Sequence, residues 1–484
     1  MVFSSHIFLF YFLPLALALY FIVGRKWKNA ILTLTSYVFY GWGEPSFVLL
    51  LLLSTCIDWG CGLVLMDYPR VSNEPLQRGG ARSRKQKIAL FVSVVSNLSL
   101  LGFFKYCDFG ISNWNMLVQM FVPQYDHLLL PMLNIALPLG ISFYTFQSMS
   151  YTIDVYRGDA KGITNPIDFA CYVSLFPQLV AGPIVRFQEV AHQMQNRVLS
   201  AEKTARGIAF FILGMAQKIL LANPCGQMAD AAFNHSGRDA LEAWWGLSAY
   251  SLQIFFDFAG YSNMAIGLGL MLGFVFPRNF DSPYRSTSIT EFWRRWHISL
   301  STWLRDYLYI PLGGNRNGVL RTYVNLFLVM FLGGLWHGAS WTFVIWGSLH
   351  GLFLMIERAV GIKVAPPKNM FLRLLRQSYT LLVVMIAWVF FRSNNVDVAW
   401  TYIGSLVGIG CVSMQSTLIH SMMGDPYHIT MWALALCYAL LAPSAWSWTR
   451  YTGIWKWCFL LVLFVLSIWA MTSQSYNPFI YFIF

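Results

Sequence analysis

The chain contains 484 residues, of which 57% are hydrophobic and only 11% are charged. Soluble domains carry about a quarter charged residues, and a single folded core cannot hide this much apolar side-chain surface from water. The composition therefore excludes an ordinary cytosolic enzyme, a disordered protein and a nucleic-acid-binding domain. The net charge of +12 fits basic cytoplasmic loops or contact with anionic lipid head groups. The eight cysteines form no CxxC pair, which argues against a disulfide framework or a zinc ribbon.

Apolar segments recur along the whole sequence. Because about 20 apolar residues span a bilayer, they predict roughly ten to thirteen membrane helices, some too short to cross alone. The first segment, residues 3–23, is followed rather than preceded by positive charge, so we expect an uncleaved span with an outward N-terminus. The later segments lie at about 29–42, 46–66, 88–106, 128–152, 167–183, 205–223, 243–275, 322–336, 340–357, 371–391, 398–413, 430–445 and 454–472. Since backbone polar groups in lipid must be bonded within their own segment, the prediction is an all-α polytopic membrane protein.

Basic residues orient the first part of the chain. The polar stretch 67–87 carries six Lys and Arg residues and is expected to be cytoplasmic. The next polar stretch, 107–127, has neither Lys nor Arg, so we expect it to face outward. The basic loop 358–376 is again expected in the cytoplasm, whereas charges beyond residue 392 are too sparse to orient the helices.

An unusual polar stretch covers residues 277–316. Ser288 and Glu291 form a capping box, which predicts a helix beginning near residue 289. Four-residue spacing would place His297, Ser301 and Arg305 on one face of that helix.

Three tryptophans accompany three arginines, Arg294, Arg295 and Arg305, along the same stretch. One interpretation is an amphipathic helix at the membrane surface, with Trp and Arg at the head-group level. The other is an inward-folded helix that lines a polar cavity, where guanidinium groups hold the phosphates of a nucleotide-like donor.

A second polar position lies between two apolar segments, at His337. Ionisable side chains at membrane depth are costly and mark candidate functional sites; the alternative is a histidine satisfied by a neighbouring backbone carbonyl. For His350, a structural role is favoured. The chain has no HExxH motif, no ligand-spaced carboxylate or thiol beside these histidines, and no Gly-x-Ser-x-Gly, which disfavours a metal site and a Ser-His-Asp triad. What remains is a histidine general base in a membrane tunnel.

These stretches resemble the membrane-bound O-acyltransferase family, most closely its branch of bacterial alginate O-acetylation proteins. The matching motifs are residues 1–5, 138–144, 151–157, 176–186, 256–267, 291–301 and 335–338. They run in family order over about residues 1–395, and the C-terminal helices, residues 371–484, match weakly.

The resemblance implies one integral membrane domain over residues 1–484, with about eleven helices around a tunnel that crosses the bilayer and a catalytic core at about 138–357. It implies acetyl-CoA as a donor from the cytoplasm, and no metal. His337 would be the catalytic base, and His297 would orient the donor or the acceptor. The residues expected to bind the donor are Arg294, Arg295, Arg305, Trp336 and Ser301.

The resemblance further implies O-acetylation of an exopolysaccharide, either alginate or, in a closely similar system, cellulose. The expected location is the bacterial inner membrane. The expected partners are an SGNH-type acetyltransferase, periplasmic or membrane-anchored, an exopolysaccharide synthesis and export complex, and membrane lipid, with no nucleic acid. Two other classes stay open: a transporter or flippase, although no paired internal repeat is visible, and a structural subunit of an export complex, which would not require His337 at depth.

Overall fold

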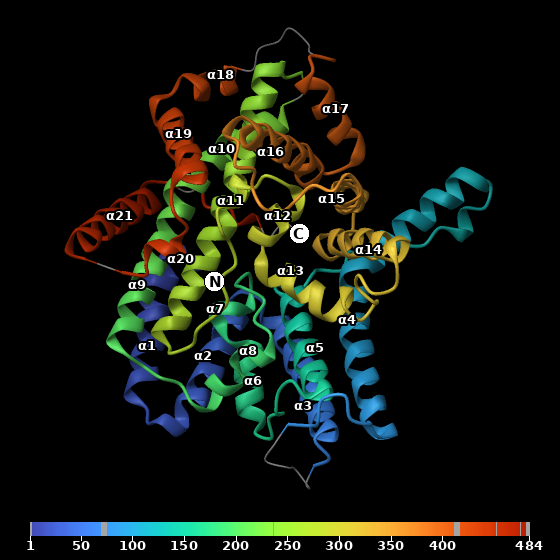
Figure 1. Cartoon of the computed structure of the whole chain (residues 1–484), viewed down its shortest axis with the longest axis vertical. Coiled ribbons are helices and arrows are strands. Elements are labelled where there is room, and N and C mark those ends of the chain that lie inside the picture. Colours follow the sequence, from blue (N-terminus) through green and yellow to red (C-terminus); the bar gives the residue numbers. More distant parts are fainter. Residues whose placement is uncertain are drawn as a thin grey trace. The chain divides into compact units, whose positions relative to one another are not determined.

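The computed structural model describes residues 2–68, 75–235, 237–410, 417–451, 453–474 and 476–480, and within these ranges it contains helices and no strand (Figure 1). Arg70 of the expected cytoplasmic loop and the end of the apolar segment 398–413 lie outside the described residues. Eight of the described helices are long and apolar enough to cross a membrane, and the segments Phe8–Ile22 and Pro426–Leu441 are shorter apolar helices. The predicted class, an all-α polytopic membrane protein, is confirmed, while the number of eleven membrane helices stays a prediction.

The eight candidate spans are Pro45–Leu65, Arg84–Phe121, Ala201–Asn234, Ala240–Met271, Val319–His337, Trp341–Val360, Met370–Arg392 and Ile454–Ser473.

The chain divides into two compact units, and the first comprises Met1–Leu199 with Leu272–Phe276. Its α-helices are α1 (Leu13–Ile22), α2 (Lys28–Gly43), α3 (Val48–Leu65), α4 (Arg84–Phe121), α5 (Ile141–Arg157), α6 (Pro166–Ser174), α7 (Phe176–Leu179) and α8 (Phe187–Gln195).

A buried polar network joins three helices of this unit. Asp58 of α3 accepts hydrogen bonds from Ser93 Oγ at 2.5 Å and Asn97 Nδ2 at 2.8 Å, both on α4. Ser93 Oγ lies 2.8 Å from the hydroxyl of Thr152 on α5. A buried carboxylate is tolerated only when its oxygens are bonded, so this network specifies how α3, α4 and α5 pack.

Two sequence expectations change in this unit. The segment 167–183 folds as two short helices, α6 and α7, because the Pro177 ring would clash with the carbonyl of Val173 in a continuous helix. The polar stretch 107–127, which separates two apolar segments in the sequence, is helical as far as Phe121 and continues α4. Its Asp108 carboxylate accepts the backbone N–H groups of Leu133 and Ile135 at 2.8 and 2.7 Å, so the following extended chain supplies the partners for its polar side chain.

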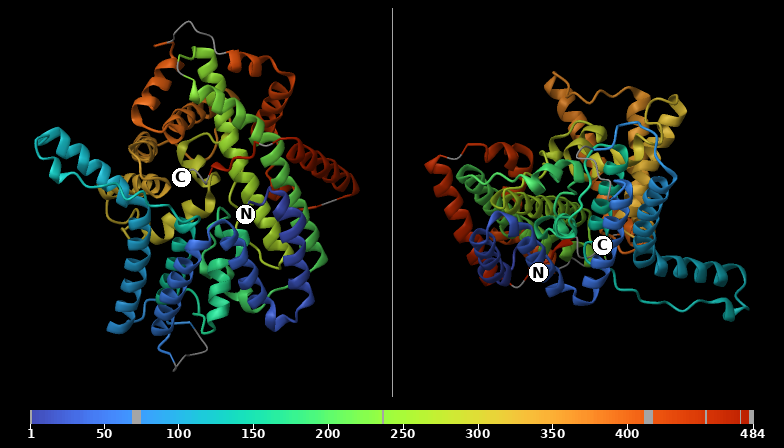
Figure 2. Two further views of the ribbon diagram at one scale, coloured as in Figure 1. Left: turned by 180° about the vertical axis from the view of Figure 1, so that it is seen from behind. Right: turned by 90° about the horizontal axis from the view of Figure 1, so that it is seen from below.

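The second unit comprises Ser200–Met271 and Pro277–Phe484, and Figure 2 shows its helices from two further sides. Its α-helices are α9 (Ala201–Ala216), α10 (Asn223–Asn234), α11 (Ala240–Met271), α12 (Ile289–Arg295), α13 (Ile298–Leu304), α14 (Val319–His337), α15 (Trp341–Val360), α16 (Met370–Arg392), α17 (Val396–Leu406), α18 (Thr417–Gly424), α19 (Pro426–Leu441), α20 (Ala445–Trp448) and α21 (Ile454–Ser473). Two π-helical turns interrupt this series, η5 (Gln217–Ala222) and η7 (Arg305–Tyr309).

Helix α11 forms the centre of the second unit and is buried along nearly its whole length. It packs against α9 through small residues, as membrane helices commonly do. A Cβ on Gly214 would lie 2.4 Å from the carbonyl oxygen of Gly260, and one on Gly267 would lie 2.5 Å from that of Gly207. The two backbones therefore approach too closely for any side chain.

A buried ion pair lies where η5 meets α11. Lys218 Nζ lies 2.6 Å from Asp257 Oδ1, and both side chains are 2% exposed. Asp257 Oδ2 accepts the backbone N–H of Ile480 at 2.7 Å, and Lys218 also donates to the carbonyl of Pro478. Because breaking one side of such a pair would leave an uncompensated buried charge, it ties the chain segment near residue 480 to the core of this unit.

Candidate active site

The predicted helix near residue 289 begins as expected but does not continue through His297. The Ser288 hydroxyl caps α12 by accepting the Glu291 backbone N–H at 3.0 Å. The chain then leaves the helix, and His297 has φ +43° and ψ +54° before α13 begins at Ile298. The expectation that His297, Ser301 and Arg305 share one continuous helical face is therefore wrong.

The break at His297 is held by a segment that comes earlier in the sequence. The backbone N–H of Ile298 donates to the carbonyl of Asn279 at 2.9 Å, and that of Asp281 donates to the carbonyl of Arg295 at 2.9 Å. A left-handed backbone costs a non-glycine residue roughly 1–2 kcal/mol. Such strain persists only where the surroundings enforce it, and it concentrates at functional sites.

A buried network fixes the orientation of the His297 ring. The Asn279 side-chain oxygen accepts the Ser299 backbone N–H at 3.2 Å and the Ser299 hydroxyl at 2.9 Å. The Asn279 amide nitrogen donates to the hydroxyl of Ser262 at 2.9 Å. His297 Nδ1 lies 3.2 Å from the same Asn279 oxygen, which is an acceptor, so Nδ1 carries the proton.

The other ring nitrogen of His297, Nε2, differs from Nδ1 in its hydrogen bonding. Its side chain is fully buried, and within the described part of the chain Nε2 has no hydrogen-bond partner. His297 lies outside the eight candidate spans, and burial lowers its pKa to about 3 because a charged imidazolium loses its hydration there. A neutral ring with a proton on Nδ1 presents Nε2 as a hydrogen-bond acceptor.

His337 is the last residue of α14, and its side chain is buried. Its ring lies 5.0 Å from that of Trp346 and 5.2 Å from that of Phe391, both edge-on. It also lines a cavity of about 120 Å³ together with Trp293 and Ser301. The aromatic walls exclude bulk water from most of the ring.

Trp336 lies between the two histidines. Its ring centroid is 6.1 Å from that of His297 and 5.0 Å from that of His337. The structure therefore brings four of the predicted residues into one neighbourhood: His297, Ser301, Trp336 and His337.

The three predicted arginines lie elsewhere. Arg295 forms an ion pair with Glu291 at 2.8 Å, and Arg305 forms one with Asp306 at 2.6 Å. Arg294 is exposed. None of the three lines the cavity beside His337.

His350 belongs to the wall behind this cavity. Its Nδ1 accepts the indole N–H of Trp293 at 3.3 Å, and its ring packs 5.0 Å from that of Trp346. These contacts give it a packing position behind two residues that line the cavity.

The sequence analysis did not identify Asn279, Ser262 or Ser299 as site residues. Asn279 lies 18 residues before His297, and no single helix connects the two, so their spacing in the sequence does not predict the contact. The one signal that points to Asn279 is its place in the polar stretch 277–316. Within the described residues, no three His, Cys, Asp or Glu side chains are arranged to hold a metal ion.

Comparison with known proteins identifies the class to which this membrane protein belongs. Residues 157–398 match the model of the membrane-bound O-acyltransferase family. This chain belongs to that family, and it is an acyltransferase.

Its relatives include probable alginate O-acetylases and a peptidoglycan O-acetyltransferase. It is 45% identical over 442 residues to a probable alginate O-acetylase of Pseudomonas aeruginosa, covering 91% of this chain and 81% of the relative. It is 41% identical over 508 residues to the corresponding protein of Pseudomonas putida, covering all of both chains. A peptidoglycan O-acetyltransferase of Helicobacter pylori is 35% identical over 447 residues, covering 86% of this chain and 81% of that protein. The chain is thus a multi-pass membrane enzyme.

Proposed function

We propose that this enzyme takes acetyl groups from cytoplasmic acetyl-CoA and passes them across the bacterial inner membrane for O-acetylation of an exopolysaccharide. The observation that carries the proposal is the cavity that His337 and Ser301 both line. The names of the similar Pseudomonas proteins favour alginate as the acceptor. Cellulose, in a closely similar system, is the second candidate polymer.

His337 is the proposed general base. As an acceptor hydroxyl, on the polymer or on a partner's serine, attacks the thioester carbonyl, His337 takes the hydroxyl proton. The carbon–sulfur bond then breaks, and the proton passes to the leaving thiolate. General-base help of this kind contributes about 10²–10⁴-fold. The aromatic walls around His337 support the role because they shield the thioester from hydrolysis.

His297 is the proposed positioning group. Its strained backbone and the Asn279 network preset its ring, and Nε2 is left as an acceptor. An N–H or O–H group of acetyl-CoA or of the hydroxyl substrate would donate a hydrogen bond to Nε2. A group held in advance costs no reorganisation during the reaction.

Donor binding is the proposed role of Ser301, Trp336 and the three arginines. Ser301 shares the cavity with His337, and Trp336 contacts both histidine rings. Arg294 is exposed and free of a carboxylate partner among the described residues, so it is the best placed of the three to meet CoA phosphates. Arg295 and Arg305 would first have to leave their carboxylate partners.

The triple change Arg294→Ala, Arg295→Ala, Arg305→Ala tests the arginines. We expect weaker acetyl-CoA binding with little loss of protein, because charge-assisted hydrogen bonds to phosphate are lost. Affinity is measured by titration of the purified variant with acetyl-CoA. Unchanged affinity would assign the arginines to the lipid interface.

The proposed catalytic core is about residues 138–357, which contain both histidines and the residues around their cavity. The proposed N-terminus is periplasmic. An SGNH-type acetyltransferase and the export complex would complete transfer to the polymer.

The central test compares His337→Gln with the unmodified chain. Glutamine keeps polar bulk and hydrogen bonding but accepts no proton near neutral pH. We expect acetylation of the secreted polymer to fall at least about 100-fold while membrane abundance stays near normal, because a base acts mainly in the transition state.

His350→Gln is the matched control, since His350 packs nearby without lining the cavity. We expect it to change abundance and activity together. Substantial acetylation by His337→Gln would contradict the general-base role. Turnover of labelled acetyl-CoA by the purified chain separates an enzyme from a transporter or a structural subunit, for which no turnover is expected.

A further inference from the structure

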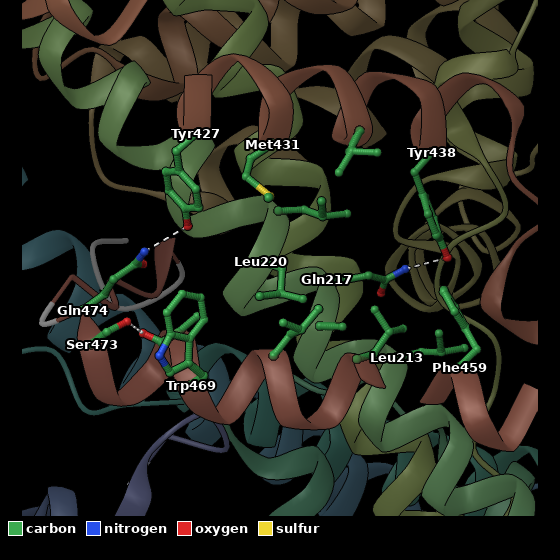
Figure 3. A pocket seen from close by; sticks show the side chains of 16 residues that line it. Leu213, Gln217, Leu220, Tyr427, Met431, Tyr438, Phe459, Trp469, Ser473 and Gln474 are labelled. Carbon is green, nitrogen blue, oxygen red and sulfur yellow. Dashed lines mark hydrogen bonds between the residues drawn. The ribbon is translucent and has the colours of Figure 1, made fainter. Parts of the chain in front are cut away.

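A large apolar cleft lies in the second unit, away from the histidines. It has a volume of about 540 Å³ and lies between α19 and α21, with α9 and η5 as its floor (Figure 3). We call it the α19–α21 cleft. Its residues on α19 are Tyr427, Met431, Leu434 and Tyr438, which share one helical face.

The cleft has the length of a lipid chain. Its lining on α21 runs from Phe459 to Gln474, fifteen residues or about 22 Å at 1.5 Å per residue. One leaflet of the hydrocarbon core is about 15 Å thick. An acyl chain lying along α21 would therefore fit within the cleft.

Polar side chains border the cleft at two places and are already bonded across it. Gln474 donates to the hydroxyl of Tyr427 at 2.9 Å, and Gln217 donates to that of Tyr438 at 2.9 Å (Figure 3). Between these bonds the walls are apolar, and large side chains stay open: Leu434 is 52% exposed and Phe459 is 50% exposed. An apolar void of this size loses dispersion contacts unless something fills it.

A basic cluster, Arg206, Arg450 and Lys456, lies at the Phe459 end, and Arg450 is close enough to Arg206 for their charges to interact. The guanidinium of Arg206 lies 4.9 Å from the Trp446 ring centroid, and Lys456 Nζ lies 4.7 Å from that of Trp448.

The basic cluster adjoins the cleft. The Trp448 ring contacts that of Phe459, which lines the cleft, at 6.0 Å. Arg206 precedes the cleft residue Leu213 by two turns of α9.

The basic cluster keeps a net positive charge. In the described part of the chain, no carboxylate forms an ion pair with any of its three members, and the acidic residue nearest in sequence, Glu202, lies one turn before Arg206. Aromatic and basic residues together at a helix end are typical of a membrane interface, and anionic lipid head groups are attracted to such clusters.

We propose that the α19–α21 cleft and the basic cluster together bind one anionic phospholipid. Its acyl chain lies between α19 and α21, and its phosphate lies against Arg206, Arg450 and Lys456. The lipid packs α19 and α21 against η5, which carries Lys218 of the buried ion pair. The proposal does not depend on the donor or the acceptor of the enzyme.

The test uses the full chain, reconstituted in nanodiscs of phosphatidylcholine with or without phosphatidylglycerol. After extraction into mild detergent, retained lipid is counted by native mass spectrometry. We expect one phosphatidylglycerol per chain and little phosphatidylcholine.

The triple change Arg206→Gln, Arg450→Gln, Lys456→Gln should weaken retention of phosphatidylglycerol about 100-fold, since each basic residue near an anionic lipid contributes about a factor of five. The matched control is Arg321→Gln, an exposed arginine at the start of another helix, and it should retain the lipid.

A second pair of variants tests the cleft itself. Leu466→Trp places a bulky ring in the cleft and should expel the lipid, whereas Leu461→Trp, on the same helix but outside the cleft, should retain it. Both leucines are exposed, at 41% and 63%, so both variants should fold. The proposal is overturned if the unmodified chain retains no lipid, if it retains both lipids equally, or if Leu466→Trp retains as much as Leu461→Trp.

Discussion

At the scale of single residues, Asn279 controls which nitrogen of His297 is free. Its side-chain oxygen accepts from Ser299 and lies 3.2 Å from His297 Nδ1. We expect Asn279→Ala to release the ring and to lower kcat about 10- to 100-fold, the range found for partners that orient metal-binding histidines. Membrane abundance should change less. Acetyl transfer by the purified chain and quantitative blotting provide the two measurements.

Asn279→Asp separates orientation from charge. It keeps an acceptor for His297 but places a carboxylate beside the ring, which raises the pKa of His297 from its low value of about 3. The neutral ring exists only above that pKa, so activity of Asn279→Asp should fall with decreasing pH at a higher pH than in the unmodified chain. An unchanged pH profile together with normal activity in Asn279→Ala would show that Asn279 has only a packing role.

The sequence predicts the two histidines of this site but not the residues that orient them. His337 stands out because an ionisable side chain is costly between two apolar segments, and His297 stands out by its place in the polar stretch 277–316 and in the motif at residues 291–301. The Asn279 contact depends on a chain path that no local period describes. The arginines are predicted from residue type and helical spacing, without regard to their own partners. The structure pairs Arg295 with Glu291, four residues earlier on α12, and Arg305 with the adjacent Asp306.

At the scale of helices, the sequence predicts where α12 begins but not where it ends. Ser288 caps α12 as its sequence pattern predicts, because a capping box involves only neighbouring residues. The end of α12 at Arg295 depends on two backbone hydrogen bonds, one from the Asp281 N–H to the carbonyl of Arg295 and one from the Ile298 N–H to the carbonyl of Asn279. Helical spacing therefore misplaced Arg305 relative to His297.

The packing of α14 against α15 positions His337 and offers a test at this scale. A Cβ on Gly347 of α15 would lie 2.5 Å from the carbonyl oxygen of Met330 and 3.0 Å from Gly334 Cα, both on α14. We expect Gly347→Ala to separate the helices, to cost about 1–3 kcal/mol and to lower the Tm and the activity together. Thermal unfolding in detergent measures the first effect.

Gly102→Ala is the control for that experiment. Gly102 is also within a long helix, α4, but a Cβ there meets nothing within 4 Å. Alanine has the higher helix propensity, so this change should keep or slightly raise the Tm. Equal Tm values for Gly347→Ala and Gly102→Ala would contradict the close packing of α14 on α15.

At the scale of the whole molecule, composition and family motifs predicted the class of fold correctly. The apolar fraction required membrane helices, and the described helices include eight that are long enough. The number of spans is harder to predict, because Pro177 divides one apolar segment while α4 continues through a polar one. Hydropathy measures only apolar content. It does not detect that a proline ends a helix, or that the Asp108 carboxylate is hydrogen-bonded by a later segment of the same chain.

Orientation in the membrane is the remaining whole-molecule prediction. Helix α4 has 38 residues, so its path is about 57 Å long, more than the roughly 30 Å of the hydrocarbon core, and it bends along this path (Figure 2). Its basic start should be cytoplasmic, and its other end should then lie outside.

We place cysteines at Ala81 and Gln124, which are exposed before and after α4. Ser83 is unsuitable because it caps α4 by accepting the Gln86 backbone N–H at 3.2 Å. In intact spheroplasts, a membrane-impermeant thiol reagent should label Gln124→Cys and leave Ala81→Cys unlabelled until the membrane is permeabilised, with the unmodified chain as the background for its native cysteines. The reverse pattern would invert the proposed orientation of the N-terminal part, and with it the side from which we expect acetyl-CoA to enter.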